Sequence, residues 1–167
     1  MAQAAGLLIH QPLRPIGTMV RGIVCPPEIE ATLSGNDPAH GLPSIAVAAT
    51  IGRFIAGHVL TVSRIKRPRR WRGPDIDFEQ LEGLDEVWVL CFRRPGAGWR
   101  LLGRFLEQDA FGIFSIKDKR DIGANYEAAA DEVIQAWGAW LGSLNPQRGI
   151  DLAAYLSGVL YNVDETT

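Results

Sequence analysis

Three apolar runs separated by two short turn segments constrain the fold of this chain more than any other feature. The runs are Glu86–Arg93, Trp99–Leu106 and Ala110–Lys117, and the connections between them read PGAG and EQD. Connections this short join neighbouring antiparallel strands, whereas parallel strands need a crossover of a dozen or more residues. Residues 86–118 are therefore predicted to form an antiparallel three-stranded meander, and the first strand, apolar on both faces, is expected to be central.

Helices are predicted on both sides of this meander. Residues 44–62 carry apolar side chains at helical spacing after a serine that can cap a helix. The end of this helix stays open, because residues 59–65 also fit an extended segment. Residues 126–141 follow an asparagine cap and predict a second helix, and residues 151–161 predict a shorter third one.

The N-terminal quarter, residues 1–43, has a different character. Six prolines divide it into short pieces, with a two-turn helix at 27–33 and a candidate strand at 16–24. The full length of 167 residues suits one domain. The predicted fold is therefore a single α+β domain over residues 1–167, in which a small antiparallel sheet of three or four strands packs against helices, two of them C-terminal.

Charge is distributed very unevenly along this chain. The net charge is only −2, but residues 64–72 hold six basic and no acidic side chains, and residues 75–86 hold six acidic and no basic ones. Two explanations fit. The blocks neutralise each other or form solvated faces, or the basic segment is an arm that binds a polyanion. Net charge therefore excludes a generally basic protein but not a local basic site.

The second strand of the meander adds two cations to this pattern. Alternation along Trp99–Leu106 places Arg100 and Arg104 on one face and the core side chains on the other. Salt bridges to nearby carboxylates are one explanation for the cations of the meander. The other is a cationic sheet face that contacts phosphates, with tryptophans that stack on bases. The candidate binding residues are Arg64, Lys66, Arg67, Arg69, Arg70, Trp71, Arg72, Arg93, Arg94, Trp99 and Arg104.

The sequence offers no convincing set of metal ligands or cofactor-binding residues. The three histidines are scattered, and there is no CxxC pair, no phosphate-binding glycine loop after a strand and no nucleophile elbow. The carboxylates of residues 75–86 are interpreted as a solvated acidic face. We therefore expect no metal and no cofactor.

Targeting features are also weak. Two cysteines are too few for a disulfide framework, and a reducing cytoplasm suits both of them. No positive charge precedes the first leucines, which argues against a signal peptide. The most apolar stretch, residues 45–62, carries Arg53 and His58 near its middle, which disfavours insertion into a membrane.

From Leu81 to Trp137 the order of features resembles the RelE/ParE family of small bacterial toxins. LEGLDEVWVLCFR (81–93) corresponds to the entry and first strand of that family, GWRLLGRF (98–105) to its aromatic-Arg strand, and FGIFSIKDKR (111–120) to the strand with a basic end. The resemblance covers about a third of the chain.

The resemblance implies a metal-free chemistry on RNA. Ribosome-dependent members of the family cleave mRNA with arginine, lysine and tyrosine rather than histidine. The matching catalytic candidates are Arg100, Lys117, Lys119 and Arg120, with Tyr126 for proton transfer. In such a site the 2′-hydroxyl of the RNA attacks phosphorus, and the cations stabilise the developing charge.

Two hypotheses of function follow. In the first, the chain is a small soluble cytoplasmic protein that binds a macromolecule, another protein or RNA, through the basic face and arm, without catalysis. In the second, it is a RelE-like endoribonuclease of bacterial or phage origin that acts on mRNA on the ribosome or free. A second copy of the chain or an antitoxin is the expected protein partner, and no membrane is involved.

Overall fold

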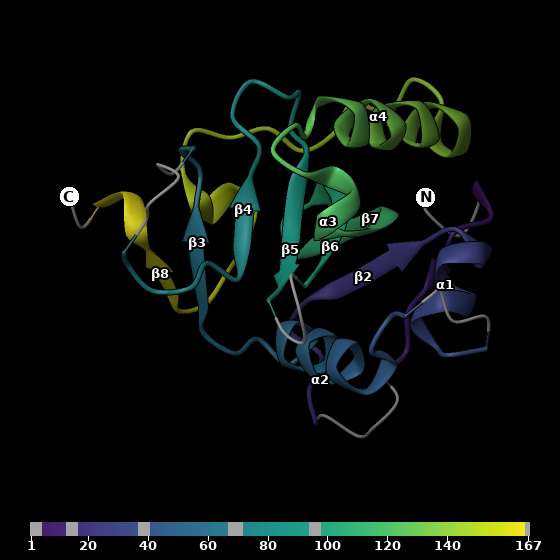
Figure 1. Ribbon diagram of the computed structural model, residues 1–167, viewed down its shortest axis with the longest axis horizontal. Coiled ribbons are helices and arrows are strands. Elements are labelled where there is room, and N and C mark those ends of the chain that lie inside the picture. The colour runs from purple at the N-terminus through teal and green to yellow at the C-terminus, as the bar shows by residue number, and fades with distance from the viewer. Residues whose placement is uncertain (1–4, 13–16, 37–40, 67–71, 94–97, 166–167) are drawn as a thin grey trace.

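The structure is built around one large sheet. A computed structural model describes residues 5–12, 17–36, 41–66, 72–93 and 98–165, and the strands in these ranges follow the order β1-β2-β7-β6-β5-β4-β3-β8 (Figure 1). Their bounds are β1 Leu8–Ile9, β2 Gly22–Cys25, β3 Leu60–Ser63, β4 Phe78–Gln80, β5 Trp88–Phe92, β6 Trp99–Glu107, β7 Ala110–Asp118 and β8 Leu160–Asn162.

The predicted small antiparallel sheet is wrong, because the sheet is mixed and eight-stranded. The β5-β6-β7 meander is antiparallel and lies near its centre. Around it, β2 joins β7 in parallel, and β3 pairs in parallel with both β4 and β8. Parallel partners are joined by long connections, and strands of two to four residues carry too little periodicity to be recognised. The sequence pattern therefore revealed the centre of the sheet and missed its flanks.

Close approach of two strands explains one glycine of the meander. The pairing of β6 with β7 shifts register between Leu102 and Gly103. A Cβ atom at Gly103 would lie 1.7 Å from the carbonyl oxygen of Gly112 on the neighbouring strand. Only glycine therefore permits this approach without a change in the backbone.

Helices lie on both faces of the sheet. Helices α1 (Pro27–Leu33) and α2 (Ser44–Ile55) pack on one face, and α4 (Glu127–Leu141) covers part of the other, with the short α3 (Lys119–Ile122) beside it (Figure 1). The predictions of α1 and α4 are confirmed. The Asn125 side chain accepts a hydrogen bond from the Glu127 N–H at 2.9 Å, as expected of a residue that caps α4.

The predicted helix over residues 44–62 is too long. Helix α2 ends at Ile55, and β3 begins at Leu60. Gly57 lies between them with φ 75°, and a Cβ atom there would lie 2.8 Å from Val20. A left-handed residue ends the helix at this point. Of the two interpretations left open for residues 59–65, the extended one is correct.

The predicted helix over residues 151–161 is wrong. Leu152–Ala154 form a single 3₁₀ turn, and Leu160–Asn162 form the edge strand β8. A second 3₁₀ turn follows at Val163–Glu165. Gly158 has φ 85°, which interrupts any helix between the two elements. The apolar spacing in this segment therefore reflects burial of loop side chains in the core.

Two apolar cores lie on opposite faces of the sheet. The core on the α1–α2 side is aromatic, with the rings of Phe78 and Trp88 5.4 Å apart and those of Trp88 and Phe105 5.5 Å apart. On the other face, Val133 and Trp137 of α4 pack on the sheet. Helix α4 contacts β6 and β7.

None of the helices in the described ranges is long and apolar enough to cross a membrane. The longest, α4, has 15 residues and carries Asp131 and Glu132. The apolar stretch over residues 45–62 is divided between α2 and β3.

Candidate functional site

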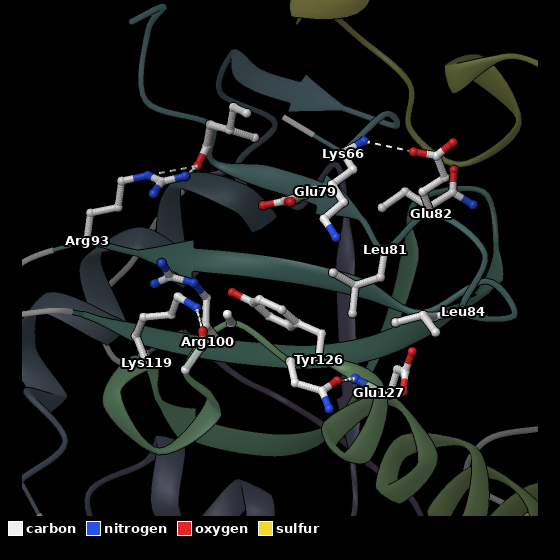
Figure 2. Close-up of a pocket in the computed structure, with 15 residues that line it drawn as sticks. Lys66, Glu79, Leu81, Glu82, Leu84, Arg93, Arg100, Lys119, Tyr126 and Glu127 are labelled. Carbon is white, nitrogen blue, oxygen red and sulfur yellow. Dashed lines mark hydrogen bonds between the residues drawn. The ribbon is translucent and has the colours of Figure 1, made fainter. Parts of the chain in front are cut away.

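A pocket of about 890 Å³ opens on the α4 side of the sheet, beside the start of that helix. Its walls come from β4, the residue that follows β5, β6, the loop 81–87, α3 and the first turn of α4 (Figure 2). Its lining includes four cations, three carboxylates and one tyrosine: Lys66, Arg93, Arg100, Lys119, Glu79, Glu82, Glu127 and Tyr126. The formal sum of +4 and −3 is +1, so the pocket is weakly positive overall.

The charges are separated within the pocket. One side of the pocket holds Arg93, Arg100 and Lys119 (Figure 2). The opposite side holds Glu82 and Leu84, and Tyr126 lies between the two sides. The cations come from the end of β5, from β6 and from α3. The pocket therefore has a distinctly cationic side.

Arg100 is buried on this cationic side, with 5% of its surface exposed. Its Nη1 donates to the carbonyl oxygens of Phe92 at 3.0 Å and Trp99 at 2.9 Å. Its Nε is buried and has no hydrogen-bond partner among the described residues. None of the ion pairs in the described part of the chain involves Arg100. A buried guanidinium is thus left without a neutralising carboxylate.

Lys119 is the second cation of this side, and a short helix start places it. Asp118 accepts a hydrogen bond from the Arg120 N–H at 2.8 Å and so begins α3. The Lys119 ammonium lies 4.6 Å from the centre of the Tyr126 ring and donates to the carbonyl oxygen of Gly123. Burial and the nearby charge of Arg100 lower the pKa of Lys119.

Tyr126 precedes α4, and its hydroxyl points toward Arg100 (Figure 2). Burial raises the pKa of this phenol, and the positive charge of Arg100 opposes that rise only in part. The phenol is therefore a proton donor rather than a base near neutral pH.

Cys91 lies opposite Arg100 in the pairing of β5 with β6. Burial raises the pKa of the Cys91 thiol to about 11, although Arg100 acts in the opposite direction. A thiol with this pKa stays protonated and is a poor nucleophile. Cys25 is the last residue of β2, and both cysteines are free and buried.

The structure brings together five of the residues singled out from the sequence. Lys66, Arg93, Arg100, Lys119 and Tyr126 all line the pocket. They come from the basic segment, the meander and the segment before α4, which are separated by up to sixty residues of chain. The sheet topology unites them, because β6 begins beside the end of β5, and β4 and β3 follow β5 in the sheet.

Two further catalytic candidates are engaged elsewhere. The Lys117 ammonium lies 2.6 Å from a carboxylate oxygen of Glu132 on α4. Arg120 is largely exposed and pairs with Asp118 at 2.6 Å. Neither lines the pocket.

Several binding candidates also lie outside the pocket. The face of Arg104 was expected to be open, but α4 covers it and Arg104 is only 3% exposed. Trp99 is buried in the core on the other face and has no face free for a base. The Arg64 guanidinium lies over the Tyr155 ring and donates to Gln80.

The remaining binding candidates lie at or beyond the edges of the described ranges. Arg72 is exposed. The others lie outside the described residues: Arg67, Arg69, Arg70, Trp71 and Arg94.

Sequence reasoning missed the residues of the pocket that come from the acidic segment. Glu79 and Glu82 line the pocket, although the whole segment was interpreted as a solvated face. The signal that existed is alternation: acidic residues at 75, 77 and 79 with Ile76 and Phe78 between them. This period of two is typical of a strand, and β4 begins at Phe78.

Comparison with protein-family models, curated proteins and solved structures finds no match for this chain. Within the described ranges, no group of three or more histidine, cysteine, aspartate or glutamate side chains is placed to hold a metal ion.

Proposed function

We propose that the protein binds single-stranded RNA and takes one phosphate of the strand into the pocket beside Arg100. The observation that carries this proposal is the buried Arg100 guanidinium, whose Nε has no partner and whose charge has no paired carboxylate in the described part of the chain. Burial of an unpaired charge costs several kcal/mol. A ligand that is anionic and accepts hydrogen bonds removes this cost.

Phosphate suits the cationic side better than other anions. A guanidinium presents a planar set of donors that matches two phosphate oxygens. The Lys119 ammonium and the N-terminal end of α4 add further positive potential beside it. Together they supply donors from more than one direction, as an anionic group with several oxygens requires.

The size of the pocket favours a single strand. At about 890 Å³ it is far larger than a phosphate group needs, and it lies within the range of pockets that hold an organic ligand. A single strand can turn one nucleotide out into such a pocket, whereas the phosphates of a duplex are held on a rigid helix.

The basic segment supports a strand rather than a free nucleotide. Lys66 lines the pocket, and the sequence that follows it supplies four more arginines up to residue 72. A second phosphate of the strand can contact Lys66, and the arginines that follow Lys66 in the sequence add positive charge to the chain. Such contacts add affinity without sequence preference.

The test is binding of a short labelled single-stranded RNA, followed by fluorescence anisotropy at several salt concentrations. We expect binding that weakens as salt rises, because phosphate contacts release counterions. Arg100→Met is expected to weaken binding at least about tenfold. Arg53→Met is the matched control, since Arg53 is exposed on α2 on the opposite face.

Absence of binding at low salt contradicts the proposal, and so does equal binding by Arg100→Met and the control. Single-stranded DNA and an RNA duplex of the same sequence are measured in parallel. Equal affinity for the duplex contradicts the preference for a single strand. Equal affinity for single-stranded DNA widens the ligand class to any single strand.

A second candidate function is cleavage of the bound RNA. It is favoured by the clustering of Arg100, Lys119 and Tyr126, the residue types that the RelE/ParE resemblance implies. The 2′-hydroxyl would lose its proton to water as its oxygen attacks phosphorus, and the bond from phosphorus to the 5′-oxygen would break. Tyr126, kept protonated by its raised pKa, would give its proton to the departing 5′-oxygen. Arg100 would stabilise the charge on the phosphoryl oxygens.

Expression of the chain alone in bacteria tests this candidate. An RNase of this kind stops growth and leaves RNA ends with a 2′,3′-cyclic phosphate, and Tyr126→Phe relieves both effects. Normal growth and intact RNA would leave only the binding function.

A further inference from the structure

Two consecutive residues at the edge of the pocket hold a strained backbone. Asp85 has φ 44° and Glu86 has φ 60°, and neither is glycine. Non-glycine residues in this region cost about 1–3 kcal/mol each and persist only where surrounding contacts hold them. The contacts that hold this turn therefore point to its role.

Asp85 is held by two arginines from distant segments. Arg104 of β6 donates to the Asp85 carbonyl oxygen at 2.6 and 3.1 Å and also to its carboxylate. Arg148, from the segment after α4, donates to the other carboxylate oxygen. These contacts lower the pKa of Asp85, the hydrogen bond from Arg148 most of all. The carboxylate therefore stays ionised and keeps both partners.

Glu86 is held in the same way. The Tyr155 hydroxyl donates to its carboxylate at 2.7 Å, and the side-chain amide of Gln80 donates to it at 3.0 Å. Arg148 lies 3.7 Å from its second carboxylate oxygen. The turn is thus tied to the C-terminal segment at two consecutive residues.

The loop that contains this turn forms one wall of the pocket. Leu81, Glu82 and Leu84 line the cavity. The loop is closed by hydrogen bonds from the Leu81 N–H to the Val87 carbonyl at 2.9 Å and from the Leu84 N–H to the Leu81 carbonyl at 3.1 Å. The Glu82 carboxylate also accepts from the Lys66 N–H at 3.0 Å. Displacement of the turn would therefore move both this wall and the start of the basic segment.

We propose that Asp85 is a positioning residue for the RNA pocket, and that Arg148 is the surface residue that holds it in place. The inference rests on the proposed function, and it means that residues outside the pocket hold one of the pocket walls in place. Arg148 is 57% exposed and does not line the pocket. Its effect on binding is therefore expected to pass through the position of the loop rather than through contact with phosphate.

Salt dependence separates positioning from contact. Loss of a residue that touches phosphate lowers the slope of log affinity against log salt by about 0.7 for a single strand. We expect Arg148→Met to bind single-stranded RNA about three to ten times more weakly than wild type, with an unchanged slope. Arg100→Met lowers the slope, and Arg148→Lys recovers part of the affinity. The Arg53→Met control removes the same charge from a remote site.

Hydrogen exchange reports on the loop without any ligand. The Leu84 amide donates to the Leu81 carbonyl, and the Val87 amide donates to the Leu84 carbonyl at 3.1 Å. Arg148→Met is expected to accelerate hydrogen exchange of these two amides, while the amides of β6 keep their protection. Asp85→Asn keeps one acceptor oxygen and is expected to fall between wild type and Asp85→Ala in both measurements. An exposed variant such as Arg148→Met is expected to fold normally.

The outcomes are distinct. A lower salt slope for Arg148→Met makes Arg148 a phosphate contact and overturns the inference, as does wild-type affinity combined with wild-type exchange. Failure of the wild-type protein to bind RNA overturns the proposed function. Faster exchange of the loop in Arg148→Met would then still show that Arg148 holds this wall of the pocket.

Discussion

Arg100 and Arg104 lie four residues apart on the same strand and the same face, yet their surroundings differ completely. Arg104 donates to Asp85 and lies 5.6 Å from the centre of the Trp137 ring beneath α4. Arg100 lies beyond the end of that helix, faces the pocket and keeps a buried Nε without a partner among the described residues. Similar burial, at 3% and 5% exposure, therefore conceals two different roles.

The difference arises from segments far away in the chain. The loop 81–87 and α4 supply a carboxylate and an aromatic ring to Arg104, whereas Tyr126, which precedes α4, points its hydroxyl toward Arg100 (Figure 2). A satisfied buried cation is typical of a structural residue, and an unsatisfied one at a pocket is typical of a binding residue. The comparison suggests that partners, rather than burial, distinguish the two roles.

The largest effect on stability is expected at Arg104. Arg104→Met removes its hydrogen bonds to Asp85 and its contact with the face of Trp137, and it leaves a strained turn with one partner fewer. Loss of one member of a buried pair costs up to about 3–5 kcal/mol, and because Asp85 is half-exposed we expect about 2–3 kcal/mol. Urea unfolding measures it. A loss below about 0.5 kcal/mol would remove the structural role of Arg104.

Arg100 is expected to behave in the opposite way. Arg100→Met removes a buried charge that has no ion-pair partner in the described part of the chain, which stabilises the fold, but it also removes the two hydrogen bonds from Nη1 to backbone carbonyls. Because these effects oppose each other, the free energy of unfolding should change by less than about 1 kcal/mol. RNA binding should fall sharply in the same variant. If Arg100→Met proves as destabilising as Arg104→Met, the distinction between the two arginines is lost.

Lys119 sharpens the comparison through pH. Burial and the charge of Arg100 lower the pKa of Lys119. As pH rises, Lys119 therefore loses its positive charge at a lower pH than an ordinary lysine does. RNA binding should then weaken about fivefold, which corresponds to roughly 1 kcal/mol. The unfolded chain keeps this proton to higher pH, so the contribution of Lys119 to stability rises over that interval, and unfolding at this group cannot explain the loss. Lys119→Arg should bind without this pH dependence, and a pH dependence shared by both proteins would contradict the assignment.

The smallest effect is expected at Arg120, which neighbours Lys119 but does not line the pocket. Arg120→Ala should bind RNA within about twofold of wild type, because its guanidinium pairs with Asp118 on the surface. A larger loss would return Arg120 to the binding site.

The same pair has an acid signature. The side chain of Arg120 lowers the pKa of Asp118 to about 2, and the Arg120 N–H adds to this effect. Stability from this carboxylate is present above its ordinary pKa of about 3.9 and is lost as pH falls from there toward 2. Asp118→Asn should show a smaller fall in melting temperature over this interval than wild type. An identical fall in both proteins would exclude this contribution.

The centre of the fold was predictable because its elements are long and locally connected. The strands at 88–92, 99–107 and 110–118 and the helix at 127–141 carry clear periodicity or short turns. The flanking strands have two to four residues each, and their parallel partners are set by packing rather than by local sequence. The segment at 151–161 has a helical spacing of apolar residues, but Gly158 and the open edge of the sheet place it in a strand.

The sequence predicted which types of residue form the site, but not which of these residues are covered by other segments. Alternation correctly placed Arg100 and Arg104 on one face, but nothing local to β6 indicated that α4 covers only one of them. The interpretation of residues 75–86 as a solvated acidic face fails at Asp85, whose partners Arg104 and Arg148 lie 19 and 63 residues away in the sequence. Such contacts are determined by tertiary structure alone.

The central claim is that the Arg100 Nε–H gains its partner from the ligand, and NMR can observe this group directly. The Nε–H signals of Arg100 and Arg104 are assigned by their loss in Arg100→Lys and Arg104→Lys and are followed during addition of single-stranded RNA. The account predicts that the Arg100 signal shifts and becomes protected from exchange with water, while the Arg104 signal, already bonded to Asp85, stays in place. An Arg100 signal that does not change at saturating RNA would contradict it.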